Sequence, residues 1–115
     1  MNAGHDRAIR STTTDDIAGS RASRSLGIVM GIAIRSRGVG GNIMAGLEAL
    51  GNGSALAEFT ADLVGVRREA LARMETEAAE RGADAVLGVR FDAAEVGREM
   101  VEVVAYGTAV LLVAE

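Results

Sequence analysis

Carboxylates in the C-terminal part of the chain are the side chains best suited to chemistry. Four of them fall in and beside two predicted strands: Asp84, Asp92, Glu95 and Glu102. Carboxylate oxygens are the ligands that Mg²⁺ and Ca²⁺ prefer in proteins, and a symmetric assembly would multiply them around its axis. We therefore treat these four residues as a candidate metal site, with a solvated acidic hairpin as the alternative.

A glycine-rich stretch is a second candidate, for binding an anion. It leads from a predicted strand into a predicted helix and contains Arg35, Arg37, Gly38, Gly40, Gly41 and Asn42. Free N–H groups in such a loop, with a helix N-terminus behind them, bind phosphate or carboxylate. Ile43 stands where the dinucleotide-binding pattern needs a third glycine. The alternative is a tight turn that needs glycine for left-handed backbone angles, and the sequence favours it.

The composition excludes several kinds of chemistry. The chain of 115 residues has no Cys and a single His, His5, so disulfides, thiolate metal sites and cysteine nucleophiles are ruled out. Soft metal ions prefer the thiolate and imidazole ligands that are scarce here. Because the predicted folded region has no His, we expect no enzyme activity. The net charge of −4 argues against nucleic-acid binding.

Hydropathy patterns predict three strands and two helices. Alternation with a period of two predicts strands over residues 26–35, 85–91 and 98–113, with a polar turn over 92–97. Helices are predicted over residues 43–50 and 54–81, the second from apolar residues at three- and four-residue steps. Residues 1–24 are polar and are interpreted as an arm, part of which could pair at a sheet edge. We expect this arm to precede a single domain, residues 25–115.

The order of these elements predicts an α+β fold, β-α(α)-β-β. A right-handed crossover makes the first two strands parallel, and the last two form a hairpin. The result is a three-stranded sheet in the order 1-3-2, packed on the long helix. Helices would cover one face, yet both faces of the first and third strands are largely apolar, so further copies of the chain should bury the second face in a ring. The alternative is a helix pair that covers both faces.

Three segments carry a family resemblance. They are Gly82-Ala83-Asp84-Ala85-Val86, Val89-Arg90-Phe91-Asp92 and Glu102-Val103-Val104-Ala105-Tyr106-Gly107-Thr108-Ala109-Val110, with shorter matches from residue 26 onward. Together they resemble the YbjQ family, which is named for a heavy-metal-binding domain and has no assigned biochemical role. The resemblance implies a small subunit similar to those of dodecins, assembled into pentamers or multiples of them.

Two departures from the family pattern affect the expected structure. Residues 20–25 are polar and small where family members alternate apolar residues, so the first strand is expected to start late. Gly51-Asn52-Gly53-Ser54 replaces a Gly-Gly-Glu-like turn, so the acidic residue of that turn is missing.

The expected function follows from these features. The most apolar run, residues 101–114, is shorter than the roughly 20 residues that span a bilayer, and we expect a cytoplasmic protein without membrane or nucleic-acid partners. The chain should form a homopentamer or decamer that binds a divalent metal ion or another small ligand at its subunit interfaces. The alternatives are a scaffold ring without a ligand, and an enzyme whose interface site uses Asp92 or Tyr106.

Overall fold

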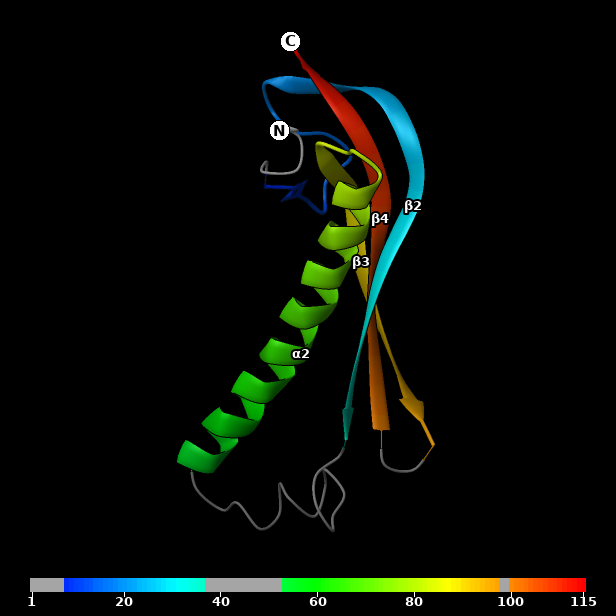
Figure 1. The fold of residues 1–115 in the computed structure, drawn as a ribbon. Helices are drawn as coiled ribbons and strands as arrows, with labels where there is room; N and C mark the ends of the chain where they lie inside the picture. The colour runs from blue at the N-terminus through cyan, green and yellow to red at the C-terminus, as the bar shows by residue number, and fades with distance from the viewer. Residues whose placement is uncertain (1–7, 37–52, 98–99) are drawn as a thin grey trace.

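The computed structural model describes residues 8–36, 53–97 and 100–115 and shows one helix packed on one side of a twisted sheet (Figure 1). The elements, in chain order, are β1 (Arg10–Ser11), β2 (Ser20–Ser36), α2 (Gly53–Glu80), β3 (Ala85–Val96) and β4 (Met100–Ala114). The α+β class and the long helix are confirmed. The helix predicted over residues 43–50 lies outside the described residues.

The sheet has four strands in the order β1-β3-β4-β2, so the prediction of a three-stranded sheet is wrong. The fourth strand is the short β1, which runs parallel to β3, whereas β2 and β3 both pair antiparallel with β4. The chain after β1 continues along β3: Thr12 N donates to Val86 O over 3.0 Å and Gly88 N donates to Thr14 O over 2.9 Å. The polar segment joins the sheet because main-chain groups, not side chains, make these bonds.

Two strands are longer than their side-chain patterns predict. β2 begins at Ser20 rather than near residue 26, so the expected late start is wrong. β3 continues to Val96, through residues that were predicted to be a turn. In both cases β4 lies alongside and supplies the main-chain partners, from Ala114 opposite Ser20 to Met100 opposite Val96. A neighbouring strand therefore outweighs the polarity of the side chains in these two segments.

The core lies between α2 and one face of the sheet and consists of small aliphatic side chains. Val66, Ala70, Met74 and Ala78 of the helix are buried against strand residues that are also buried. Those strand residues are Val29 and Ala33 of β2, Val86 and Val89 of β3, and Val103, Ala105 and Ala109 of β4. Small residues on both sides let the helix backbone come close to β2.

Gly31 marks the point of closest approach. A Cβ atom built there would overlap the backbone of Ala70 and Met74 in α2. Backbone atoms of a helix cannot move aside as a flexible side chain can, so this position accepts only glycine. The contact between α2 and β2 thus depends on the absence of one methyl group.

The opposite face of the sheet carries the bulky residues of β2 and is open. Ile28, Met30, Ile32 and Ile34 are exposed by 64%, 47%, 41% and 48%. They alternate along β2 with the buried Val29, Gly31 and Ala33, as expected for side chains on opposite faces of one strand. Helix α2 covers one face, as expected, and we call the other the open face (Figure 1).

The close approach at Gly31 predicts a large cost for adding a side chain there. We expect Gly31→Ala to lower the free energy of unfolding by about 1–3 kcal/mol, because the helix must be pushed off the sheet. Urea unfolding, followed by circular dichroism at equal protein concentrations, measures this change.

Gly65→Ala is the matched control for this measurement. A Cβ atom at Gly65 in α2 meets nothing within 4 Å. This variant should be more stable than the wild type by about 0.5–1 kcal/mol, because alanine favours the helix. Equal effects of the two substitutions would contradict the packing described here.

Candidate functional site

Asp84 is one of the four predicted metal ligands, and its carboxylate is engaged in holding the fold. It lies between α2 and β3, and its Oδ2 accepts a hydrogen bond of 2.9 Å from Leu112 N. Its own N–H donates to Val110 O over 2.9 Å. The residue therefore fastens the start of β3 to the C-terminal half of β4, which is a sufficient structural reason for an aspartate there.

The other three predicted ligands lie on the β3–β4 hairpin, on two different faces. Asp92 stands opposite Val104 and Glu102 stands opposite Ala94, which places both carboxylates on the open face. Glu95 is an odd number of residues from Asp92 along β3 and lies on the other face. Asp92 Oδ1 also accepts a hydrogen bond of 3.0 Å from Ala93 N.

The distance along β3 keeps Asp84 away from the other three carboxylates. Asp92 follows Asp84 by eight positions, which corresponds to about 26 Å of extended strand. Within the described ranges, no group of three or more His, Cys, Asp or Glu side chains comes together to hold a metal ion. A single chain therefore brings only Asp92 and Glu102 into the same neighbourhood.

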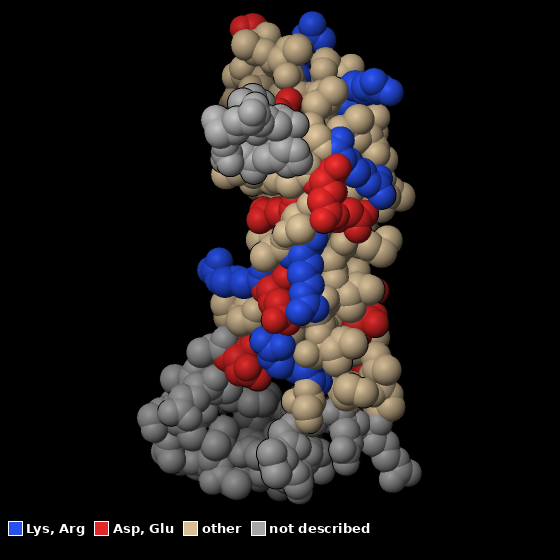
Figure 2. Space-filling model, viewed as in Figure 1, with Lys and Arg blue, Asp and Glu red and all other residues tan. Residues whose placement is uncertain are grey.

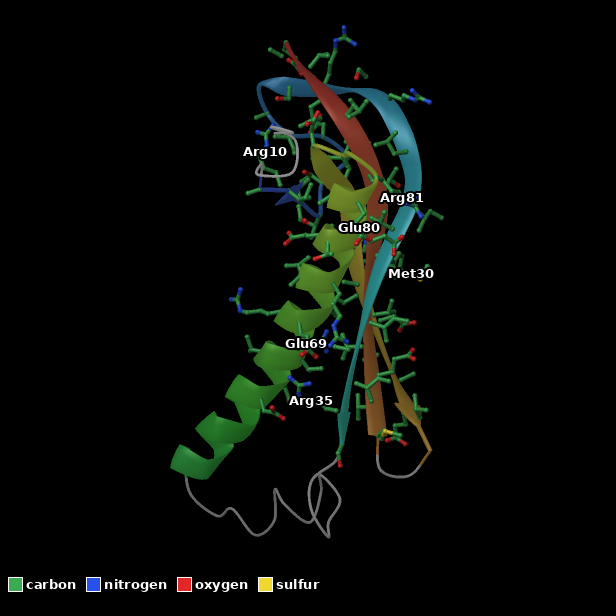
Figure 3. All side chains as sticks on the ribbon, viewed as in Figure 1. Arg10, Met30, Arg35, Glu69, Glu80 and Arg81 are labelled. Carbon is green, nitrogen blue, oxygen red and sulfur yellow. The ribbon has the colours of Figure 1, made fainter. Side chains whose placement is uncertain are left out.

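The candidate anion site is described only at its first residue. Arg35 is the last large residue of β2, and its Nη1 lies 3.1 Å from Glu69 Oε2 (Figure 3). Its Nε lies 3.7 Å from Asp62 Oδ1. The guanidinium is thus directed to carboxylates of α2, while Arg37, Gly38, Gly40, Gly41 and Asn42 lie outside the described residues.

The open face is apolar along β2 and more polar along β4 and β3. Each cross-strand row takes one residue from β2, one from β4 and one from β3. The rows are Met30 with Tyr106 and Arg90, Ile32 with Val104 and Asp92, and Ile34 with Glu102 and Ala94. A molecule that covers this face would meet aliphatic side chains over β2 and ionisable ones over β3 and β4.

Arg90 and Tyr106 border the open face differently. Arg90 turns toward the N-terminal arm, because its Nη1 donates to Thr13 O over 3.0 Å and to Val89 O over 2.9 Å. Tyr106 remains 40% exposed beside Met30. The aromatic ring thus extends the apolar surface of β2 onto β4.

A hollow lies beside Asp84, one of the predicted metal ligands. It has a volume of about 550 Å³ and is lined by Ala8, Arg10, Ser20, Asp84, Leu112, Val113 and Ala114. Its one basic and one acidic side chain carry opposite charges, so the hollow favours neither an anion nor a cation. Figure 3 shows Arg10 at the end of the molecule where β4 ends.

A ladder of charged residues joins α2 to the outer edge of β2, and only its helical part can be recognised in the sequence. Glu69 pairs with Arg73 and Glu77 pairs with Arg81, both at the helical spacing of four residues. Figure 2 shows acidic and basic side chains alternating along this side of the molecule. The four-residue spacing can be read from the sequence, whereas the contacts of the arginines with β2 can be seen only in the structure.

Comparisons with known proteins agree on a family. The YbjQ family model, described as "Putative heavy-metal-binding", matches residues 9–113. A UPF0145 protein of Thermoplasma acidophilum is 46% identical over 99 residues, which cover 86% of this chain and 82% of that protein. A UPF0145 protein of Bradyrhizobium is 44% identical over 100 residues, covering 87% of this chain and 89% of the relative.

A solved structure supports the fold. A protein of unknown function from Pediococcus pentosaceus aligns with a TM-score of 0.59 at 16% identity, over 91% of this chain and 98% of that one. At this level of identity the likeness concerns the fold alone. In the described part of the chain, no helix is long and apolar enough to cross a membrane.

The donor set of one chain does not fit the heavy-metal site that the family description suggests. Soft metal ions prefer thiolate and imidazole ligands, but the sequence has no Cys, and its single His lies outside the described residues. The open face offers two carboxylates and the thioether of Met30 instead. Through its family match and its relatives, this chain belongs to the YbjQ family.

Proposed function

We propose that this chain functions as a homo-oligomer whose copies bury the open face, and that the assembly binds a small cation or another small ligand between subunits. A ring of five, or a pair of such rings, is the assembly that the family resemblance suggests. The proposal includes a cytoplasmic location and no catalysis. Thiol and imidazole groups, which carry much nucleophilic and acid–base catalysis, are nearly absent from the sequence.

The observation that carries the proposal is the exposure of large aliphatic side chains on the open face. Ile28, Met30, Ile32 and Ile34 follow one another on one side of a single strand, and Tyr106 extends the surface. Burying the exposed part of each such side chain stabilises an assembly by on the order of 1 kcal/mol. A contiguous apolar surface of this kind is typical of protein–protein interfaces.

The cation part of the proposal is supported by the place of two carboxylates. Asp92 and Glu102 lie on the same open face that another copy would cover. Packing several copies together would therefore bring several carboxylates close to one another. Ca²⁺ binds six to eight oxygen ligands and Mg²⁺ binds six. The two carboxylates of one chain are therefore too few, and an assembly would supply more.

The second candidate is a scaffold ring without a small ligand. It is favoured by the absence of a cluster of three metal-ligating side chains among the described residues. The two candidates share the assembly and differ only in whether it binds a ligand, so separate experiments test them.

The assembly is tested by placing charges on the open face. We expect Ile28→Lys/Ile32→Lys to dissociate the oligomer to single chains, because a lysine ammonium cannot be buried in an apolar contact without a large desolvation cost. Native mass spectrometry and light scattering measure the mass.

Leu63→Lys/Val64→Lys is the matched control for the assembly test. These two residues of α2 are exposed by 42% and 44%, close to the values on the open face, and lie on the helix instead. This control should keep the wild-type mass. A wild-type protein that is a single chain at micromolar concentration, or a control that dissociates as the open-face variant does, would refute the proposal.

The cation site is tested by calorimetric titration of the intact oligomer with Ca²⁺, Mg²⁺ and Zn²⁺. We expect saturable binding of at least one ion, and Asp92→Asn/Glu102→Gln should weaken it at least about tenfold by removing the charged oxygen ligands. Glu95→Gln, on the opposite face of the same hairpin, should leave the affinity unchanged. An intact wild-type oligomer that binds none of the three ions would favour the scaffold ring.

A further inference from the structure

The outer edge of β2 is a second surface on which copies of this chain could associate. β2 is the last strand in the sheet order and pairs only with β4 among the described strands. An unpaired strand edge offers a row of N–H and C=O groups to any other strand. This edge belongs to the same apolar, isoleucine-rich stretch as the open face, which is the composition that aggregates most readily.

Two arginines of α2 occupy this edge. Arg73 Nη1 donates a hydrogen bond of 2.6 Å to Ile32 O, and Arg81 Nη1 donates one of 3.1 Å to Leu26 O. Both guanidinium groups are held in place on the helix: Arg73 lies 3.7 Å from Glu69 and Arg81 lies 3.1 Å from Glu77. Figure 3 shows Arg81 directed from α2 toward β2.

The main-chain groups of an antiparallel strand point alternately toward its partner strand and away from it, so two blocked carbonyls can close a stretch of the free edge. Every second residue of β2 directs its main-chain groups to β4, and the residues between direct theirs outward. Leu26 and Ile32 belong to the outward set, since their carbonyls accept from the helix arginines. Between Leu26 and Ile32, whose carbonyls are capped by the arginines, only Ile28 and Met30 have free outward groups. Two such residues are too few for stable pairing with a new strand.

The charge of the arginines adds to this effect. A hydrogen bond from a guanidinium to a carbonyl is stronger than one between neutral groups. A strand that approached β2 would have to displace both guanidinium groups or leave them without carbonyl partners. Lysine and arginine near sheet edges serve this purpose in natural proteins.

We propose that Arg73 and Arg81 guard the outer edge of β2 and prevent β2 of a second copy from adding to it. The open face is then free for assembly, whereas the edge of β2 between Leu26 and Ile32 is closed to a new strand. This inference rests on hydrogen bonds from arginine side chains to main-chain carbonyls and does not depend on the proposed function. It holds for the single chain and for any assembly through the open face.

The test removes the guanidinium groups and keeps the positions polar. Arg73→Gln/Arg81→Gln changes the net charge from −4 to −6, because two positive charges are lost. Higher net charge opposes association, so growth of larger species would have to come from the uncapped edge. We expect the fraction of mass above the wild-type assembly to rise at least about tenfold over a day, as measured by light scattering and native mass spectrometry.

A second readout locates the new contact. Hydrogen exchange followed by mass spectrometry should show slower exchange in the peptide that contains Ile28 and Met30, because outward N–H groups there would gain strand partners. Circular dichroism and urea unfolding show whether the variant is folded. If the double variant does not fold, Arg73→Gln and Arg81→Gln are measured singly against the same criterion.

Arg67→Gln/Arg68→Gln is the matched control. It makes the same change of charge on the same helix, at exposed positions for which the structure gives no bond to the described residues of β2. This control should keep the wild-type mass.

Three results would overturn the inference. They are an unchanged mass distribution in the folded Arg73→Gln/Arg81→Gln variant, equal growth in the Arg67→Gln/Arg68→Gln control, and larger species without slower exchange around Ile28. The test of the proposed function expects the opposite change in mass, because the open-face lysine variant should give smaller species than the wild type. Failure of one proposal is therefore distinguishable from failure of the other.

Discussion

The close contact between α2 and β2 is the constraint on which the rest of the structure depends. The helix approaches so closely at Gly31 that only the small residues of β2 can face it. Since strand side chains alternate, Ile28, Met30, Ile32 and Ile34 must point the other way. The open face is thus a direct consequence of the tight, alanine-rich core between α2 and β2.

The same contact explains why the edge of β2 and its open face differ. Because α2 lies close to β2, Arg73 and Arg81, which are about two helical turns apart, can reach the outward carbonyls of Ile32 and Leu26. They cannot cover the side chains on the far side of the sheet. The helix therefore protects the main chain of β2 and leaves its isoleucines exposed. The two carboxylates on the open face, Asp92 and Glu102, add a polar border that a copy of the chain would meet.

The features that side-chain patterns describe could be predicted from the sequence. The helix predicted over residues 54–81 is Gly53–Glu80, and the alternation in β2 separates its two faces correctly. The features that depend on a neighbouring strand could not. β1, the first residues of β2 and the end of β3 are polar segments that become strands because main-chain partners stand beside them. The four predicted metal ligands do not form one cluster, because the length of β3 places Asp84 far from Glu102.

The burial of the open face is the central claim, and the absence of Cys allows it to be measured directly. A single thiol introduced as Met30→Cys reports the accessibility of that face in the assembled protein, and Leu63→Cys on α2 is the reference. The account predicts that the thiol at residue 30 reacts with a maleimide many times more slowly than the thiol at residue 63. Equal rates would contradict it, because their exposed fractions in the single chain, 47% and 42%, are similar.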